Sequence, residues 1–215
     1  MKTKILIVAY CLCLIFLFSF DGQENGILQN VFQGEPTDTV KREIPLDPKG
    51  RPYLSYVFVK QKANQLNLDS IELGYDSLQL RIWFDYSLAK SRHLIIIRRK
   101  DGKWDCRLYK MLVEWSPRQD SQIVVNKTIK KIVPKMGLDK FMKRLFALDI
   151  TSLPNGPSGG MDGTSYEIEV ATKDQYRFYE YWSPDTTEQK FWGSKNMVEI
   201  IDLLEKECGF KRLQK

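Results

Sequence analysis

Acidic side chains are the first residues of this 215-residue chain whose type and spacing could do chemistry. Asp162, Glu167 and Glu169 lie close together in the stretch MDGTSYEIEV, residues 161–170. Two carboxyl groups that flank a glycosidic bond are the usual catalytic pair of a glycosidase, so these acids make the chain a candidate hydrolase of envelope polymers. However, Glu167 and Glu169 alternate with apolar residues, as solvent-facing positions of a strand do. We therefore treat acid-pair hydrolysis as the alternative function and assign no catalytic residue.

Other catalytic or metal-binding side chains are few. His93 is the one histidine of the chain, and a lone histidine beside an apolar strand usually has a structural role. The sequence contains no P-loop, no H-E-x-x-H and no G-x-G-x-x-G motif. Asp162-Gly163 lacks the repeated acids of a calcium loop, so we predict a turn that begins a strand. We expect no metal and no cofactor, and a protein that is not an enzyme.

Two cysteines, Cys106 and Cys208, lie outside the first 22 residues. They are too far apart in sequence for the spacing of a metal site. In an oxidising compartment a single disulfide between them would close a loop of about a hundred residues. Two buried free thiols are the alternative, and the sequence leaves both possibilities open.

An aromatic hairpin is predicted near the end of the chain. SYEIEVAT and QYRFYEYW, residues 165–172 and 175–182, each alternate as strands do, and Lys173-Asp174 between them suits a tight turn. On the second strand, Tyr176 and Phe178 share one side and are expected in the core. The other side of this strand remains as a candidate binding surface.

Arg177, Tyr179 and Tyr181 form that other side, and they are our predicted ligand-binding residues. Tyrosine and arginine are enriched in binding hot spots, and stacked aromatic rings suit sugars, peptides or a protein partner. Across the hairpin, Arg177 is expected to pair with Glu167 or Glu169. The alternative is that the N-terminal segment covers this surface.

The first residues have the pattern of an export signal. Lys2 and Lys4 precede sixteen uncharged and mostly apolar residues at 5–20, and polar residues follow. We predict a signal peptide over residues 1–22, although no A-x-A triplet marks the cleavage site. The alternative is a membrane anchor through residues 5–20, which is the one way in which we expect contact with a membrane.

The charge of the chain argues against nucleic acid as a partner. The 33 basic and 27 acidic residues give a net charge of +6, and the basic residues are dispersed along the sequence. A nucleic-acid-binding domain typically concentrates its Lys and Arg in one stripe. We expect instead an unknown protein or glycan partner in the cell envelope.

The middle of the chain predicts an antiparallel meander. SLQLRIWFDYS alternates, HLIIIRRK has the apolar run of a central strand, and SQIVVNKTIKKIV suits a further strand. Asp101-Gly102 is a strong hairpin turn. In WDCRLYKMLVEW the apolar positions change phase, which predicts a bulge near Leu108 and Tyr109.

Helical spacing appears in two places. The apolar residues of 138–149 form one stripe, and those of 194–208 follow a spacing of three and four residues, with Ser194 as the cap and Gly209 as the stop. Residues 56–66 are ambiguous between strand and helix. Residues 23–54 contain four prolines and no sustained period, so we predict an extended N-terminal segment.

The region 138–208 resembles the C-terminal half of small exported bacterial proteins of unknown function. The similarity lies in a short helix (FMKRLFALDI), a D-G-x-x-Y strand (MDGTSYEIEV), an aromatic return strand before a proline (YRFYEYWSPD) and a closing helix. This resemblance implies the order of the elements and a bacterial envelope setting. It implies no activity and no catalytic residue.

These patterns together predict one α+β domain at residues 55–215. We expect an antiparallel sheet of about five to seven strands, with the helices near 138–149 and 194–208 on one face. The expected protein is exported to the periplasm or secreted, and it binds a ligand rather than catalysing a reaction.

Overall fold

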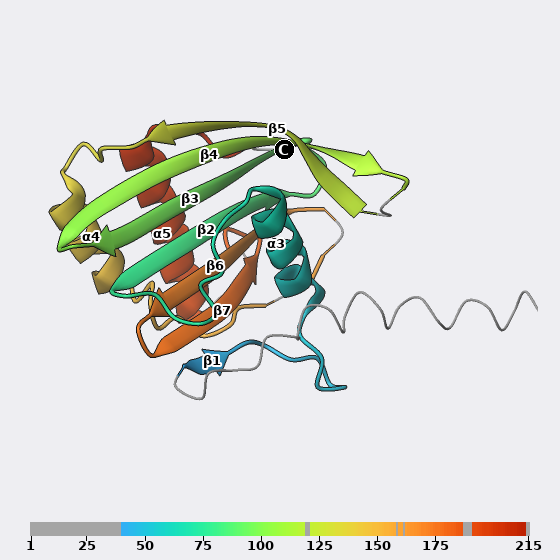
Figure 1. Cartoon of the computed structure of the whole chain (residues 1–215), viewed down its shortest axis with the longest axis horizontal. Coiled ribbons are helices and arrows are strands. Elements are labelled where there is room, and N and C mark those ends of the chain that lie inside the picture. Colours follow the sequence, from blue (N-terminus) through green and yellow to red (C-terminus); the bar gives the residue numbers. More distant parts are fainter. Residues whose placement is uncertain (1–39, 119–120, 158, 161, 187–190, 214–215) are drawn as a thin grey trace, which may run out of the picture. The chain divides into compact units, whose positions relative to one another are not determined.

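The computed structural model describes residues 40–118, 121–157, 159–160, 162–186 and 191–213, so the predicted export signal lies outside the described residues. Within them, seven strands form one sheet in the order β1-β7-β6-β2-β3-β4-β5 (Figure 1). The strands are β1 (Lys41–Glu43), β2 (Leu78–Tyr86), β3 (Ser91–Lys100), β4 (Lys103–Ser116), β5 (Ser121–Lys131), β6 (Thr164–Thr172) and β7 (Gln175–Trp182). The helices are α3 (Leu54–Gln65), α4 (Leu138–Ala147) and α5 (Trp192–Cys208). The α+β class is confirmed.

The sheet is mixed rather than purely antiparallel. All neighbouring pairs from β7 through β5 are antiparallel, as predicted. The exception is β1, which runs parallel to β7 with Arg42 beside Tyr176. The prediction for residues 23–54 missed this strand because three residues carry no detectable alternation.

Two predicted hairpin turns are present. Asp101 and Gly102 both have positive φ, 51° and 76°, between β3 and β4. Positive φ at both central residues is what a twisted two-residue hairpin requires, and glycine adopts it without steric cost. The turn at Lys173-Asp174 joins β6 to β7, with Ala171 opposite Tyr176.

One face of the sheet packs against α4 and α5, and we call it the α5 face. Ile82 of β2, Ile95 of β3 and Ile168 of β6 lie in one buried cluster with Leu145 of α4 and Ile200 of α5. Both helices place apolar residues on one side at helical spacing, and burial of that side stabilises them. The structure begins α5 at Trp192, so Ser194 lies inside the helix, and Gly209 ends it with a φ of 67°.

The opposite face is covered by α3, and we call it the α3 face. Residues Tyr56, Val59 and Ala63 of α3 are buried at spacings of three and four, which resolves the ambiguity in favour of a helix. The Tyr56 ring meets Phe178 of β7 edge to face at 5.3 Å. Figure 1 shows α3 and α5 on opposite sides of the sheet. The two predicted helices thus share a buried cluster on the α5 face, and the third helix, α3, covers the other face, because both faces of the central strands carry large side chains that must be buried.

The predicted bulge lies elsewhere. β4 pairs with β3 in unbroken register from Lys103 to Leu112. The register shifts instead between β4 and β5, where Leu112 is opposite Asn126 and Val113 is opposite Val124. Val125 is therefore the extra residue. The change of phase in β4 has another cause, since Leu108 is buried on the α5 face and Tyr109 on the α3 face.

Candidate functional site

The tyrosine side of the hairpin is not an exposed surface. Tyr179 and Tyr181 are 1% and 0% exposed. The Tyr179 hydroxyl donates to the Ile150 carbonyl, and the Tyr181 hydroxyl donates to the Pro154 carbonyl at 2.8 Å. Arg177 donates to the carbonyls of Thr151 and Leu153, at 2.7 and 3.0 Å. The loop after α4 thus occupies the polar groups that we predicted would bind a ligand.

The pairing of the hairpin explains this outcome. Tyr179 is opposite Ile168 and Tyr181 is opposite Tyr166, so both tyrosines lie on the α5 face. Tyr176 and Phe178 lie on the α3 face, and both faces are covered. The expected pairing of Arg177 with Glu167 or Glu169 is also wrong, because these acids lie on the α3 face. Arg177 pairs instead with Glu43 of β1, at 2.6 Å.

The predicted acids occupy unexpected environments. Glu169 is 0% exposed and Glu167 is 3% exposed, so the alternation that suggested solvent-facing positions reflects burial against α3. The Glu169 carboxylate accepts hydrogen bonds from Trp83 Nε1 at 2.9 Å and from the Tyr176 hydroxyl at 3.0 Å. It also lies 4.0 Å from the Arg81 guanidinium, which is itself buried. Asp162 is exposed at the bend before β6.

The carboxyl group of Glu167 is buried and incompletely hydrogen-bonded. One of its carboxyl oxygens is buried without a hydrogen-bond partner among the described residues. Nearby, Asp85 pairs with Lys62 of α3 at 2.6 Å and with Arg92 of β3. Burial, together with the negative charges of Asp85 and Glu180, raises the pKa of Glu167 to about 7 against the opposing charge of Lys62. A buried acid with a raised pKa is a common feature of catalytic sites, although structural networks produce it as well.

The raised pKa of Glu167 predicts a pH-dependent stability. The folded state holds the Glu167 proton more tightly than the unfolded state, so the bound proton stabilises the fold. This stabilisation is complete below about pH 4.5 and is lost as the pH rises through about 7. A shift of this size corresponds to about 3 kcal/mol. The free energy of unfolding of Glu167→Gln, relative to that of the wild type, should rise by about that amount between pH 4 and pH 8.

The difference between the two proteins is the right quantity because another group titrates in the opposite sense. Burial, with a smaller effect of Lys110, lowers the pKa of His93 to about 4, so the contribution of His93 is lost as the pH falls. Urea unfolding of both proteins at each pH gives the difference in their free energies of unfolding, and the contribution of His93, which both proteins share, cancels in that difference. Glu199→Gln, on the exposed side of α5, is the matched control. A difference that stays constant with pH would contradict the prediction for Glu167.

His93 and the cysteines lie in the core of the α5 face. His93 Nδ1 is 3.0 Å from the Tyr86 hydroxyl, and its ring packs against Phe210 at 5.2 Å. Cys106 of β4 and Cys208 of α5 are buried free thiols. A hydrogen bond with Cys208, together with burial, raises the pKa of the Cys106 thiol above its ordinary range. The two predicted partners are therefore neighbours, and the disulfide itself stays a prediction.

The open feature of the described structure is the outer edge of β5. Among the described strands, β4 alone lies beside β5. The Ile132 amide donates to the Cys106 carbonyl at 2.8 Å, so the even-numbered residues here point their backbone groups toward β4. Backbone direction alternates along an antiparallel pair, which leaves the N–H and C=O groups of Lys127, Ile129 and Lys131 pointing outward. We call these groups the free edge.

Part of the β5 edge is already covered by α3. The Gln65 side-chain amide accepts from the Val124 N–H at 2.8 Å and donates to the Gln122 carbonyl at 3.3 Å. This amide satisfies the backbone as a neighbouring strand would. Beyond it, no hydrogen bond joins the outward backbone groups of Lys127, Ile129 and Lys131 to any other described residue. An uncovered strand edge is a template for pairing with another chain.

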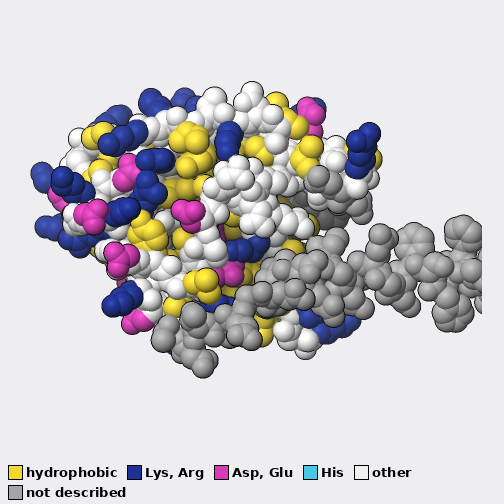
Figure 2. Space-filling view, in the orientation of Figure 1, with side chains coloured by type: hydrophobic (Ala, Val, Ile, Leu, Met, Phe, Trp, Pro, Cys, Tyr) yellow, Lys and Arg dark blue, Asp and Glu magenta, His cyan; other side chains and the backbone are white. Residues whose placement is uncertain are grey.

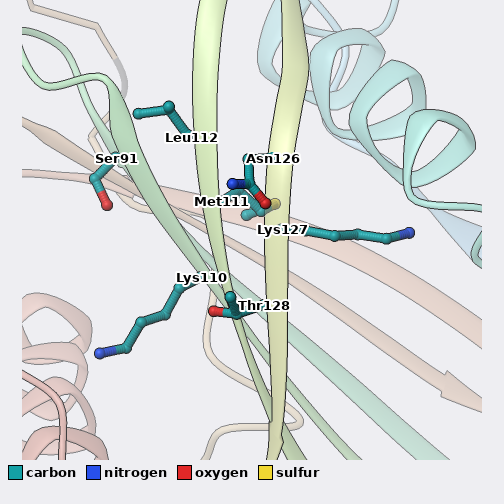
Figure 3. A pocket seen from close by; sticks show the side chains of 7 residues that line it. All are labelled: Ser91, Lys110, Met111, Leu112, Asn126, Lys127 and Thr128. Atoms are coloured by element: carbon teal, nitrogen blue, oxygen red, sulfur yellow. The ribbon is translucent and has the colours of Figure 1, made fainter.

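A shallow depression of about 210 Å³ lies beside the free edge (Figure 3). Its lining comes from three neighbouring strands, with Ser91 of β3, Lys110 and Leu112 of β4, and Asn126 and Thr128 of β5 among the residues. Figure 3 shows Lys110 and Lys127 extending in opposite directions from it. Pockets for small molecules usually measure about 300–1,000 Å³, so this depression suits a single side chain better.

Apolar and basic side chains surround the free edge. Ile129 and Val133 are 50% and 72% exposed, and Val125 and Leu112 are also exposed. Figure 2 shows Lys and Arg side chains gathered over the end of the sheet where β3, β4 and β5 meet. The sequence pattern identified β5 as a strand but not as an edge, because strand order depends on the distant pairing of β2 with β6.

Comparison of the chain with protein-family models, with curated proteins and with solved structures gave no match. Within the described residues, no group of three or more His, Cys, Asp or Glu side chains is placed to hold a metal ion. No helix in the described ranges has both the length and the apolar character needed to cross a membrane.

Proposed function

We propose that this chain is an exported, non-catalytic binding protein of the cell envelope, and that it binds an extended segment of a partner polypeptide along the free edge of β5. The observation that carries the proposal is the outward set of backbone groups at Lys127, Ile129 and Lys131, which no described residue satisfies. Residues 1–22 support export through their basic start and apolar run. The resemblance of residues 138–208 to small exported bacterial proteins is consistent with this setting.

Strand addition would use the free edge in a simple way. An incoming strand forms main-chain hydrogen bonds with the edge residues, and alternate side chains supply the specificity. On the α3 face such a strand meets the exposed side chain of Ile129. On the α5 face it runs beside Thr128 and Asn126, where the depression can take one of its side chains. A partner therefore needs an extended conformation but no preformed fold.

Removal of one outward N–H should weaken this binding. Ile129→Pro deletes the N–H at the centre of the free edge, and proline is tolerated at edge positions that face away from the sheet. Peptides selected by display on the wild-type protein should bind at least about tenfold more weakly to this variant, which corresponds to about 1.4 kcal/mol. Amide hydrogen exchange at Lys127, Ile129 and Lys131 should slow when a selected peptide binds the wild type.

Ile129→Val is the matched control, because it keeps the N–H and a branched apolar side chain. It should bind the selected peptides as the wild type does, and both variants should melt close to wild type. Selected peptides that bind Ile129→Pro as tightly as wild type, or that leave the three edge amides unprotected, would show that binding occurs elsewhere.

A hydrolase that uses an acid pair is the second candidate function. The observation in its favour is the raised pKa of Glu167, with Glu180 directly opposite on β7. A carboxyl group with a pKa near neutrality can act as a general acid. The burial of Glu167 beneath α3 favours the binding proposal. Cleavage of an envelope glycan by wild type, and its loss in Glu167→Gln, would reverse this preference.

A further inference from the structure

The residues around the free edge carry one sign of charge. β5 contains three lysines, Lys127, Lys130 and Lys131, and no acidic residue. Lys110 and Arg107 lie opposite Thr128 and Lys131 on β4 and extend this positive strip. The acid Asp105 of β4 is already paired with Arg98 and Arg107, at 3.2 and 2.9 Å. Among the described residues, no ion pair involves Lys110, Lys127, Lys130 or Lys131, so positive charge lies beside the outward backbone groups.

This charge disfavours a second copy of the chain as the occupant. In an antiparallel pairing of two β5 strands centred on Ile129, Lys127 of each copy would lie opposite Lys131 of the other. Like charges directly opposite on neighbouring strands are destabilising, and lysines on an edge are a common device against self-association. The same lysines would pair favourably with carboxylates on an incoming strand.

Resting on the proposed function, we infer that the partner segment is acidic, with Asp or Glu alternating with apolar residues. The carboxylates would lie on the α3 face, within reach of Lys127 and Lys131, and the apolar side chains would lie on the α5 face beside the depression. Attraction between opposite charges across the interface also speeds the encounter and is weakened by salt. The occupant is thus an extended acidic polypeptide, recognised by backbone pairing and by charge together.

Three short capped peptides test the inference against the purified protein. In each, valine alternates with one other residue, which is glutamate, glutamine or lysine. The glutamate peptide should bind about tenfold more tightly than the lysine peptide, with the glutamine peptide between them, because several charge pairs change sign together. The glutamate peptide should slow hydrogen exchange at the amides of Lys127, Ile129 and Lys131. Added salt should weaken its binding.

Variants separate this inference from the function on which it rests. Lys127→Glu/Lys131→Glu reverses the charge on the α3 face and should reverse the order of the peptides, whereas Lys143→Glu/Lys195→Glu, on α4 and α5, should leave it unchanged. Equal binding of all three peptides, lost in Ile129→Pro, would refute the acidic partner and keep the edge as a binding site. Failure of every peptide to protect the edge amides, or undiminished binding of the glutamate peptide to Ile129→Pro, would overturn both proposals.

Discussion

Replacement of Glu169 with alanine should lower the free energy of unfolding by about 3–5 kcal/mol, the usual cost of removing one partner from a buried ion pair. Glu169 is fully buried on the α3 face and lies 4.0 Å from the equally buried Arg81. Without the carboxylate, the Arg81 charge remains in the interior and has no other ion-pair partner among the described residues. The Trp83 N–H and the Tyr176 hydroxyl also lose their acceptor.

Two further variants show how much of this loss is due to charge. Glu169→Gln keeps the size of the side chain and removes the charge. Its oxygen can accept from the Trp83 N–H, and its NH2 group can donate to the Tyr176 hydroxyl, so its loss of stability should be smaller. Asp105→Asn disrupts the ion pairs of Asp105 with Arg98 and Arg107, which are partly exposed, and it should cost about 0–1 kcal/mol. Urea unfolding of the three variants measures these differences. A loss in Glu169→Ala no larger than that in Asp105→Asn would contradict the buried network.

Oxidation of Cys106 and Cys208 to a disulfide should raise the free energy of unfolding by about 4 kcal/mol. The two buried thiols are close enough to interact, so a bond between them should need little movement of β4 or α5. A cross-link that closes a loop of about a hundred residues lowers the entropy of the unfolded chain by the equivalent of about 4.7 kcal/mol. Residual strain in the folded state would reduce this value.

The oxidation is best performed during refolding, because both thiols are buried in the folded chain. Exchange with oxidised glutathione forms the protein disulfide and releases two molecules of reduced glutathione. Thiol titration and intact mass then confirm the bond, and urea unfolding with and without reductant measures the stabilisation. Cys208→Ser, which cannot form the bond, should unfold identically in both conditions. An oxidised wild-type protein that is less stable than the reduced one would exclude a compatible geometry.

Local signals in the sequence account for most of the elements. The alternation in residues 78–86 and 165–182, the Asp101-Gly102 turn and the spacing of the last helix each depend on neighbouring residues, so these elements could be predicted. Residues 56–66 could not be assigned, because the branched residues at their start favour a strand and the remainder favours a helix. In the structure they belong to the helix α3, whose buried side chains cover the α3 face of the sheet.

The prediction for Arg177, Tyr179 and Tyr181 failed for a related reason. Alternation shows which side chains share a side of a strand, but it does not show what covers that side. Here the loop at residues 150–154 returns across the α5 face and binds these side chains. The same limitation hid the burial of Glu167 and Glu169.

The sequence by itself determined the class of the fold, the order of most of its elements and the pair of cysteines that could meet. Only the tertiary structure decided which faces are buried, that Cys106 lies beside Cys208, and that β5 is an edge. The physical reason is that periodicity is a local property, whereas burial and strand order depend on the pairing of segments such as β2 and β6, which lie far apart in the chain.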